Sequence, residues 1–317
     1  MIARVPIALP AFAAEVAEGL LSSPKSLPCK LFYDSAGSVL FEEITCLPEY
    51  YLTRAELEIL SASAGEIAET AGSGVTVVEL GSGTAAKTCT LLRGISRRQL
   101  RVPYFPVDIS PAALDLARQR VVEECQQVSV HPVIADFGDG FGFLRRIPGR
   151  KLVLYLGSSI GNFDPEHAVA MLSQIREQLI PGDSLLLGTD FVKAESVLVP
   201  AYDDARGITA QFNKNILRRL NRELGANFDL ESFKHLAIWN PTRSRMEIYL
   251  ESLQPQNVLI RLPGMRIHLA AGEPIHTENS YKYTLPMVRD LLGAAGFILV
   301  NTWFDSRKWF ALHLAKV

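Results

Sequence analysis

The stretch Val77-Val-Glu-Leu-Gly-Ser-Gly-Thr-Ala-Ala-Lys-Thr88 decides how this chain is expected to fold. It opens inside the run Val75 to Leu80, which is rich in β-branched residues, is bounded by glycines and predicts a short buried strand. Gly81 and Gly83 follow, and glycine lets the backbone pass close to a ligand. A helix is expected next, over Thr84 to Leu92. A strand, a glycine turn and a helix in this order are typical of the ligand-binding edge of an open α/β sheet.

Strands and helices alternate along the chain beyond this turn. Short apolar runs predict further strands, and Ser110-Pro111 predicts a helix start, because a serine hydroxyl caps a helix and proline suits its first turn. Such alternation predicts a parallel, doubly wound sheet. The expected strands cover 104–107, 128–135, 151–156 and 184–188, and the expected helices cover 112–125 and 165–179.

The pattern changes after Lys193. The next segment predicts a helix and then strands of an antiparallel set, after which a helix and two strands resume the first pattern. The expected helices are 197–221 and 287–295, and the expected strands are 237–239, 245–253, 256–262, 297–303 and 310–314. We therefore predict a nucleotide-type domain interrupted by an insert that packs with the N-terminal region. The predicted boundaries are 62–194 plus 286–317 for the first domain and 1–61 plus 195–285 for the second.

Composition and charge restrict the possible partners. The 317 residues include 32 Lys and Arg against 34 Asp and Glu, so no basic field is present to hold a nucleic-acid backbone. No apolar run approaches the length of a membrane span. We expect a cytoplasmic protein that binds small molecules, with neither a nucleic acid nor a membrane as partner. The oligomeric state is left open, and a monomer is compatible with the sequence.

Cysteine and histidine spacing predicts no metal site. The four cysteines lie far apart without a Cys-x-x-Cys pair, which favours neither zinc nor a disulfide framework and suits a reducing cytosol. The six histidines show no metal-like spacing. The residues concerned are Cys29, Cys46, Cys89, Cys125, His131, His167, His235, His268, His276 and His313.

The apolar N-terminal segment, Ile2 to Ala14, has some features of a secretory signal. Glu15 and Glu18 follow it at once and prolines interrupt it, so we expect no signal peptide. Apolar residues recur at helical spacing instead and predict an amphipathic helix. These residues are Phe12, Val16 and Leu20.

Three classes of ligand compete for the glycine turn. The stretch from Gly81 to Thr88 matches a phosphate-binding P-loop, except that Ala86 stands where the second glycine belongs. Gly81, Gly83 and Ala86 also satisfy the loose dinucleotide-binding pattern. That pattern expects an acid about 20 residues further on, but none stands near Leu100. Each of these two binding patterns therefore lacks one of the residues that it requires.

The third class of ligand is S-adenosylmethionine. Glu79 ends the first strand and can face the sulfonium-bearing amino-acid part of this ligand. Asp108 ends the next strand and can accept both ribose hydroxyls, and Asp136 ends the third and can bind the adenine amino group, with the ring of Phe137 nearby. Three acids that end three successive strands line one edge of a sheet, which favours this ligand. Taken singly, Asp108 would also suit a helix cap and Asp136 a turn.

Seven stretches carry a more specific signal. They are Pro24-Lys-Ser-Leu-Pro, Leu31-Phe-Tyr-Asp-Ser-Ala-Gly-Ser, Leu47-Pro-Glu-Tyr-Tyr-Leu-Thr-Arg, Glu79-Leu-Gly-Ser-Gly-Thr, Leu156-Gly-Ser-Ser-Ile-Gly-Asn, Tyr202-Asp-Asp and Thr277-Glu-Asn-Ser. With them the chain resembles the histidine Nα-methyltransferase family of ergothioneine biosynthesis, over nearly its whole length. Several of the stretches lie outside the generic methyltransferase core, which makes them more specific than the glycine turn.

The resemblance implies a fold and a reaction. The fold is α/β, with a doubly wound, mostly parallel, Rossmann-like methyltransferase sheet and an inserted α+β substrate-binding domain. The reaction is methyl transfer from S-adenosyl-L-methionine to the α-amine of L-histidine, up to trimethylhistidine (hercynine). The implied cofactor residues are Gly81, Lys87, Asp108, Asp136 and Phe137, and the strand and turn add Glu79 and Gly83.

The resemblance also implies how the substrate's amino-acid part is bound. Asn162 and Tyr202 would hold the carboxylate and orient the α-amine, and Tyr33 would lie beside this amine as the candidate catalytic residue. In-line transfer depends on positioning. The attacking amine must be neutral, and since the pKa of an α-amine is about 8, tyrosine hydroxyls and water can carry its proton away.

A second part of the implied pocket would bind the imidazole ring. Glu278 and Ser280 would bond its two nitrogens, and Tyr50 would line the space around it. Glu278 and Ser280 stand at i and i+2, so they share one face if the segment is extended. The whole implied substrate site comprises Tyr33, Tyr50, Gly157, Asn162, Tyr202, Glu278, Asn279 and Ser280.

Four of the implied site residues would also suit ordinary structural roles. Tyr50 fits a core aromatic, Asn162 the cap of the helix that begins at Pro165, Glu278 a solvated charge and Lys87 a helix-surface lysine. The substrate is open to a similar choice, because the family likeness extends to relatives that act on tryptophan derivatives. A non-catalytic ligand-binding relative and a P-loop hydrolase are the further alternatives for the activity.

Overall fold

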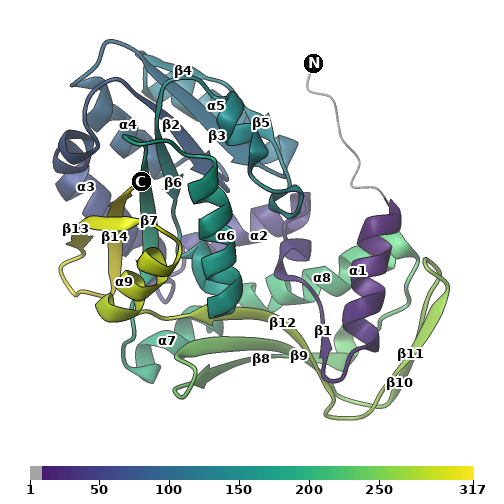
Figure 1. Ribbon diagram of the computed structural model, residues 1–317. Coiled ribbons are helices and arrows are strands. Elements are labelled where there is room, and N and C mark those ends of the chain that lie inside the picture. Colours follow the sequence, from purple (N-terminus) through teal and green to yellow (C-terminus); the bar gives the residue numbers. More distant parts are fainter. Residues whose placement is uncertain (1–8) are drawn as a thin grey trace. The chain divides into compact units, whose positions relative to one another are not determined.

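Residues 9–317 are described by the computed structural model, and their contacts separate into two units (Figure 1). The sheet unit comprises Leu52–Val192 and Tyr281–Val317. The insert unit comprises Met1–Tyr51 and Lys193–Ser280. Because helix α3 (Tyr51–Ala71) is continuous, the change between units falls at its start rather than between residues 61 and 62.

The sheet unit is built, within its described residues, on eight strands in the order β13-β14-β7-β6-β2-β3-β4, with β5 paired to β3. Strand β14 is antiparallel to β13 and β7, and the remaining pairs are parallel. Strand order reverses between β2 and β6, which confirms the predicted doubly wound, mostly parallel sheet. The strands are β2 (Val75–Leu80), β3 (Val102–Asp108), β4 (Val128–Val130), β5 (Val133–Ile134), β6 (Arg150–Tyr155), β7 (Ser184–Asp190), β13 (Ile298–Phe304) and β14 (Phe310–Lys316).

Helices cover both faces of this sheet (Figure 1). Successive residues of a buried strand point to opposite faces, so Val77 and Val78 enter two different hydrophobic clusters. Residues of α3, α4 and α5 pack in the first cluster, and residues of α6 and α9 pack in the second. The helices are α4 (Thr88–Ser96), α5 (Pro111–Glu124), α6 (Pro165–Glu177) and α9 (Leu285–Ala294).

Two predicted elements of the sheet unit differ from the structure. Helix α4 begins at Thr88 instead of Thr84, because Gly81, Gly83 and Ala85 have φ angles of 69°, 50° and 54°, which a right-handed helix does not contain. The expected strand 128–135 is divided into β4 and β5. Pro132 stands at the division and has no N–H to donate to a sheet.

The insert unit carries a four-stranded sheet and a separate strand pair among its described residues. The sheet has the order β1-β12-β9-β8, and β10 pairs antiparallel with β11. Strands β8 and β9 form the predicted antiparallel pair, but β10 does not join them as expected. Strands β1, β11 and β12 were not predicted. The strands are β1 (Lys25–Ser26), β8 (Phe233–Asn240), β9 (Arg245–Ser252), β10 (Gln256–Ile260), β11 (Met265–Leu269) and β12 (Pro274–Tyr281).

The N-terminal helix contributes to the core of the insert unit. Helix α1 (Leu9–Leu21) carries the predicted apolar stripe, and all three of its residues are buried. They pack with apolar residues of α8 and of strands β9 to β12. The stripe consists of Phe12, Val16 and Leu20. The first eight residues, which belong to the apolar segment considered as a signal, lie outside the described part of the chain.

The helix expected over 197–221 is two helices, α7 (Glu195–Tyr202) and α8 (Ile208–Leu224). Asp204 binds the first turn of the second helix, α8. Its carboxylate accepts the backbone N–H groups of Ile208 and Thr209 at 3.0 and 2.7 Å, which satisfies donors that a helix start leaves without intrahelical partners. A third helix of this unit, α2, covers Ser35–Thr45.

A membrane span requires a long apolar helix, and a metal site requires a cluster of ligating side chains. None of the helices within residues 9–317 is both long enough and apolar enough to cross a bilayer. Over the same residues, no three His, Cys, Asp or Glu side chains gather in an arrangement that could hold a metal ion.

Candidate functional site

The backbone of the glycine turn has open space beside it. At Gly81 and Gly83 the positive φ angles favour glycine, and a Cβ at either position would meet no heavy atom within 4 Å. The backbone N–H of Gly81 donates to the Val107 carbonyl at 2.8 Å, and that of Gly83 donates to Asp108 Oδ2 at 3.0 Å. The turn is thus fixed to the end of β3 and leaves space beside its backbone.

Asp108 ties the turn to the start of the next helix. Its Oδ1 accepts the backbone N–H of Ser110 at 2.9 Å, and Ser110 is the residue that caps α5. Burial raises the pKa of Asp108, and the hydrogen bonds from Ser110 and Gly83 reduce this effect without cancelling it. A carboxylate accepts about four hydrogen bonds, so these contacts leave capacity for ribose hydroxyls.

Asp136 and Phe137 follow β5 and lie half-buried at the next strand end. Asp136 Oδ1 accepts the backbone N–H of Gly138 at 2.8 Å, as expected of a turn residue. The ring of Phe137 stacks on that of Phe141 with 5.4 Å between centroids. Since β2, β3 and β5 are neighbours in the sheet, the structure brings the ends that carry Glu79, Asp108 and Asp136 to one edge.

Glu79 points inward at this edge. Its Oε1 accepts the hydroxyl of Thr88 at 2.6 Å, and its Oε2 accepts the hydroxyl of Tyr104. Burial raises the pKa of Glu79 to about 7, while the two hydroxyls and the charge of Lys87 act in the opposite direction. Both oxygens are engaged inside the sheet unit, so the geometry makes Glu79 a support of the helix start at Thr88, and its expected contact with a ligand stays a prediction.

Lys87 forms an ion pair that the sequence did not predict. Its Nζ pairs with Oε2 of Glu56, and Oε1 of Glu56 accepts the backbone N–H of Gly157 at 2.8 Å. Glu56 is fully buried on helix α3. The one signal in the sequence was that Glu56, unlike the exposed Glu58, stands at helical spacing from Leu52 and Ile59 on an apolar stripe, which predicts a paired carboxylate. The structure therefore brings Lys87 and Gly157 together through Glu56.

The segment after β6 carries Gly157 and Asn162. Gly157 has a φ of 73°, and Asn162 ends a short 3-10 helix, Ser159–Asn162. The N-cap position of α6 is occupied by Asp164, not by Asn162. Asp164 Oδ1 accepts the hydroxyl of Tyr281 at 2.7 Å, which fixes the end of this segment. Capping therefore does not explain Asn162, and its predicted role in carboxylate binding stays open.

In the insert unit, Tyr33 and Tyr50 belong to one aromatic cluster. The ring of Phe41 lies 5.7 Å from that of Tyr33 and 6.2 Å from that of Tyr50, both in edge-to-face contact. Phe212 of α8 lies 5.7 Å from Tyr33. Tyr33 and Tyr50 are half-buried, unlike the fully buried Phe32 beside them. The structure thus brings together two predicted pocket residues and leaves part of each exposed.

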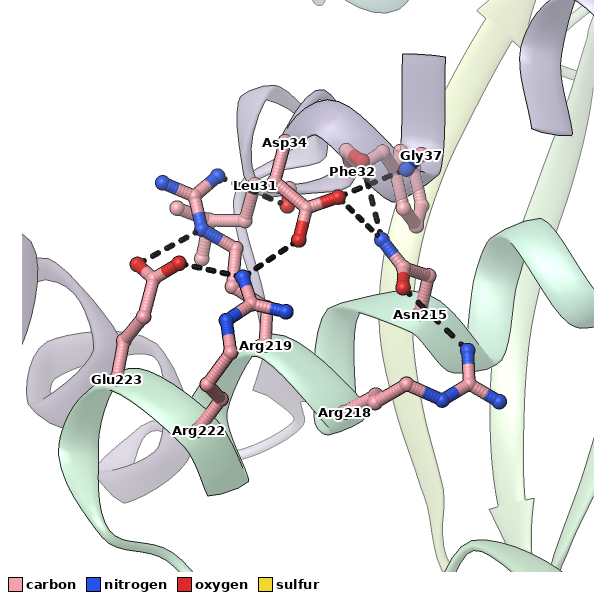
Figure 2. Close-up of polar contacts among 9 residues, drawn as sticks. All are labelled: Leu31, Phe32, Asp34, Gly37, Asn215, Arg218, Arg219, Arg222 and Glu223. Atoms are coloured by element: carbon pink, nitrogen blue, oxygen red, sulfur yellow. Dashed lines mark hydrogen bonds and ion pairs between the residues drawn. The ribbon is translucent and has the colours of Figure 1, made fainter. Parts of the chain in front are cut away.

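The residue after Tyr33 anchors this segment to helix α8 (Figure 2). Asp34 accepts the backbone N–H of Gly37 at 2.7 Å, the amide of Asn215 at 2.8 Å and the guanidinium of Arg222 at 2.6 Å. Burial raises the pKa of Asp34, but these three bonds outweigh burial and the pKa lies below its usual value. The sequence did not predict this anchor, because its partners lie on a helix far along the chain.

Tyr202 and Ser280 also meet in the insert unit. Their hydroxyl oxygens lie 2.8 Å apart, and both residues are buried. The Tyr202 carbonyl lies 2.8 Å from His235 Nε2, and His235 Nδ1 lies 2.9 Å from the Asn213 amide nitrogen. Burial lowers the pKa of His235 more than its carbonyl partner raises it. A neutral ring therefore donates to Tyr202 and accepts from Asn213, which fixes the backbone of Tyr202.

Strand β12 presents the remaining predicted residues. Glu278, Asn279 and Ser280 all lie within this strand, so the extended conformation on which the i and i+2 argument depended is present. Asn279 Oδ1 contacts His276 Nε2 at 2.9 Å. Strict alternation would put His276 and Asn279 on opposite faces, so their contact shows that β12 is not regular here, and a shared face for Glu278 and Ser280 stays a prediction. The cofactor candidates, Gly157 and Asn162 belong to the sheet unit, and the other substrate candidates belong to the insert unit.

Comparison with known proteins identifies the family. A family model described as histidine-specific methyltransferase, SAM-dependent, matches residues 12–317. The histidine N-alpha-methyltransferase of Mycolicibacterium smegmatis is 43% identical over 301 residues, which cover 95% of this chain and 93% of that protein. Ergothioneine biosynthesis protein 1 of Neurospora crassa is 32% identical over 92% of this chain and 33% of its own length. A 4-dimethylallyltryptophan N-methyltransferase of Arthroderma benhamiae is 30% identical over 91% of this chain and 88% of that protein. This chain belongs to the family of histidine-specific, S-adenosylmethionine-dependent methyltransferases.

Proposed function

We propose that this protein methylates the α-amine of L-histidine, up to trimethylhistidine, with S-adenosylmethionine as the methyl donor. The observation that carries the choice of histidine is on β12, where Glu278 stands two residues before Ser280 and Ser280 bonds Tyr202. An acid and a hydroxyl this close in the chain suit the two nitrogens of imidazole, one of which donates and one of which accepts when the ring is neutral. The relative that acts on histidine is also more similar than the one that acts on a tryptophan derivative.

The residues at the edge of the sheet unit fit the cofactor. The open backbone at Gly81 and Gly83 gives room for its amino-acid part, and Asp108 and Asp136 offer acceptors at two neighbouring strand ends. Lys87 supplies a cation for its carboxylate. When bound, the cofactor supplies an electrophilic methyl group on a cationic sulfur. The protein's own contribution is to hold the acceptor amine in line with that methyl group, which supplies much of the acceleration.

The substrate residues can bind and deprotonate an amino acid. In this proposal Asn162 and Tyr202 bind the carboxylate, and Glu278 and Ser280 bind the imidazole. Tyr33 accepts the amine proton only as its own hydroxyl proton passes to water, and this relay leaves the amine neutral, the form in which it attacks. The half-buried position of Tyr33 supports this role, because its hydroxyl serves the amine only if it remains accessible.

We also propose that the enzyme works in the cytosol on small molecules, without a nucleic acid or membrane partner. The near balance of acidic and basic residues speaks against a nucleic acid partner, and the wide spacing of Cys29, Cys46, Cys89 and Cys125 suits a reducing cytosol. Methylation of a tryptophan derivative is the second candidate, because the relative from Arthroderma benhamiae carries that name and is aligned over most of both chains.

A thermal-shift experiment tests the cofactor assignment. S-adenosylhomocysteine, the demethylated product, is expected to raise the melting temperature, whereas ATP and NAD leave it unchanged. Asp108→Ala removes an acceptor and should abolish most of the shift. Ser73→Ala, in the exposed turn before β2, is a matched control that should keep it. A shift with ATP alone would replace this assignment with the P-loop alternative.

A further inference from the structure

Glu56 contacts both proposed sites within the sheet unit. Its side chain is 0% exposed, and a buried carboxylate destabilises the fold unless it is paired and hydrogen-bonded. Oε2 pairs with Nζ of Lys87, a cofactor candidate, and Oε1 accepts the backbone N–H of Gly157, a substrate candidate, at 2.8 Å. One carboxylate therefore holds a side chain of one site and the backbone of the other.

Strand β7 provides the space for this carboxylate. A Cβ at Gly188 would lie 2.7 Å from Oε1 of Glu56 and 3.3 Å from the backbone nitrogen of Gly157. A Cβ at Gly157 would lie 3.8 Å from Nζ of Lys87. The ammonium group of Lys87 and the backbone nitrogen of Gly157 thus both lie beside the Glu56 carboxylate. A larger residue at position 188 would displace this carboxylate.

The ion pair leaves Lys87 able to bind a ligand. The Lys87 side chain is 25% exposed, although the carboxylate that it contacts is fully buried. An ammonium group has three donors, so it can hold Glu56 with one and donate to an anionic group of a ligand with another. Glu56 thereby fixes the direction in which Lys87 extends.

We propose that Glu56 is a positioning residue for methyl transfer, which fixes Lys87 for the cofactor and the Gly157 backbone for the substrate. This inference rests on the proposed function, because that function assigns Lys87 and Gly157 to the two ligands. Glu56 touches neither reacting atom and acts through these two partners. Because one oxygen contacts Lys87 and the other contacts Gly157, substitutions can separate the effect on cofactor binding from the effect on substrate binding.

Two substitutions separate the effects on the two ligands. Glu56→Gln removes the charge, and its single amide oxygen cannot accept from both Lys87 and Gly157. We expect the dissociation constant of S-adenosylhomocysteine to rise about tenfold, the effect of losing one charge-assisted hydrogen bond. Gly188→Ala keeps the charge but displaces Oε1, so histidine binding should weaken more than S-adenosylhomocysteine binding. Both constants are measured by titration calorimetry.

A double-mutant cycle tests whether Glu56 acts through Lys87. Lys87→Met alone should weaken S-adenosylhomocysteine binding, and adding Glu56→Gln should weaken it no further. Glu58→Gln, an exposed change on the same helix, is the matched control and should leave both affinities unchanged. Urea unfolding confirms that each variant is folded, and if Glu56→Gln does not fold, Gly188→Ala carries the test.

The outcomes distinguish this inference from the proposed function. Wild-type affinity for S-adenosylhomocysteine in folded Glu56→Gln, additive effects in the cycle, or unchanged histidine affinity in Gly188→Ala would each overturn the inference. If the wild-type protein binds neither S-adenosylhomocysteine nor histidine, the proposed function itself fails.

Discussion

At the scale of single residues, burial controls the charge of the glutamate below the glycine turn. Glu79 is 4% exposed, and burial raises its pKa from 4.5 to about 7 despite the hydroxyls of Thr88 and Tyr104. Between these values the folded protein binds a proton that the unfolded chain releases. The stabilising contribution of this group is therefore complete below pH 4.5 and is lost as the pH rises through 7.

Glu79→Gln is expected to remove this dependence on pH. Glutamine does not ionise, so the free energy of unfolding of the variant should fall less than that of the wild type as the pH rises from 4.5 to 7. The difference in slope should reach up to about 1.4 kcal/mol per pH unit, which corresponds to one proton. Urea unfolding followed by circular dichroism over this pH range measures it. Parallel profiles for the two proteins would show that Glu79 is ionised throughout.

At the scale of elements, helix α8 holds the segment that carries Tyr33. Asp34 caps α2 and is bound by Asn215 and Arg222 of α8, and Arg219 of the same helix donates to the Leu31 carbonyl at 3.1 Å (Figure 2). Together these bonds fix both sides of Tyr33. A loosened segment would misplace the tyrosine without touching the cofactor residues, which belong to the sheet unit.

Asp34→Asn should therefore slow catalysis without weakening cofactor binding. Asparagine still caps a helix, but it loses the charge that pairs with Arg222. We expect kcat for histidine methylation to fall about tenfold, or about 1.4 kcal/mol, with KM for S-adenosylmethionine unchanged. Gln211→Ala is the control, since Gln211 is exposed on the same helix and lies outside the hydrogen bonds that hold Asp34. Turnover at the wild-type rate in Asp34→Asn would exclude a positioning role.

Elements with a local signal could be predicted from the sequence. The β-branched run predicted strand β2 with the bounds that the structure has, and Ser110-Pro111 predicted the start of α5. Strand β1 could not be found because it has two residues and pairs with β12, far along the chain. Strand β12 was missed because it carries the polar residues of the proposed pocket, so no alternating apolar pattern marks it.

The same distinction applies to the candidate site. The three strand-end acids could be placed from sequence, because parallel strands end at one sheet edge. The inward direction of Glu79 could not, since it depends on hydroxyls of Thr88 and Tyr104 that only tertiary packing brings near. Glu56 was missed for a related reason: its partners lie 31 and 101 residues away in the chain.

At the scale of the whole molecule, each unit is assembled from segments far apart in sequence. Strands β13 and β14 complete the sheet begun by β2, and β1 and α1 join the insert unit from the other end of the chain. The family model covers both units, from residue 12 to residue 317. The central claim, methylation of the histidine α-amine, therefore concerns the chain as a whole rather than one motif.

Competition among amino acids tests this claim most directly. The wild-type protein is incubated with S-adenosylmethionine and equimolar histidine, tryptophan, tyrosine and phenylalanine, and the products are followed by mass. A pocket that bonds both nitrogens of imidazole rejects side chains that cannot make these bonds, so methylated histidine should form in strong preference to the other three products. Faster methylation of tryptophan or tyrosine than of histidine would contradict the account.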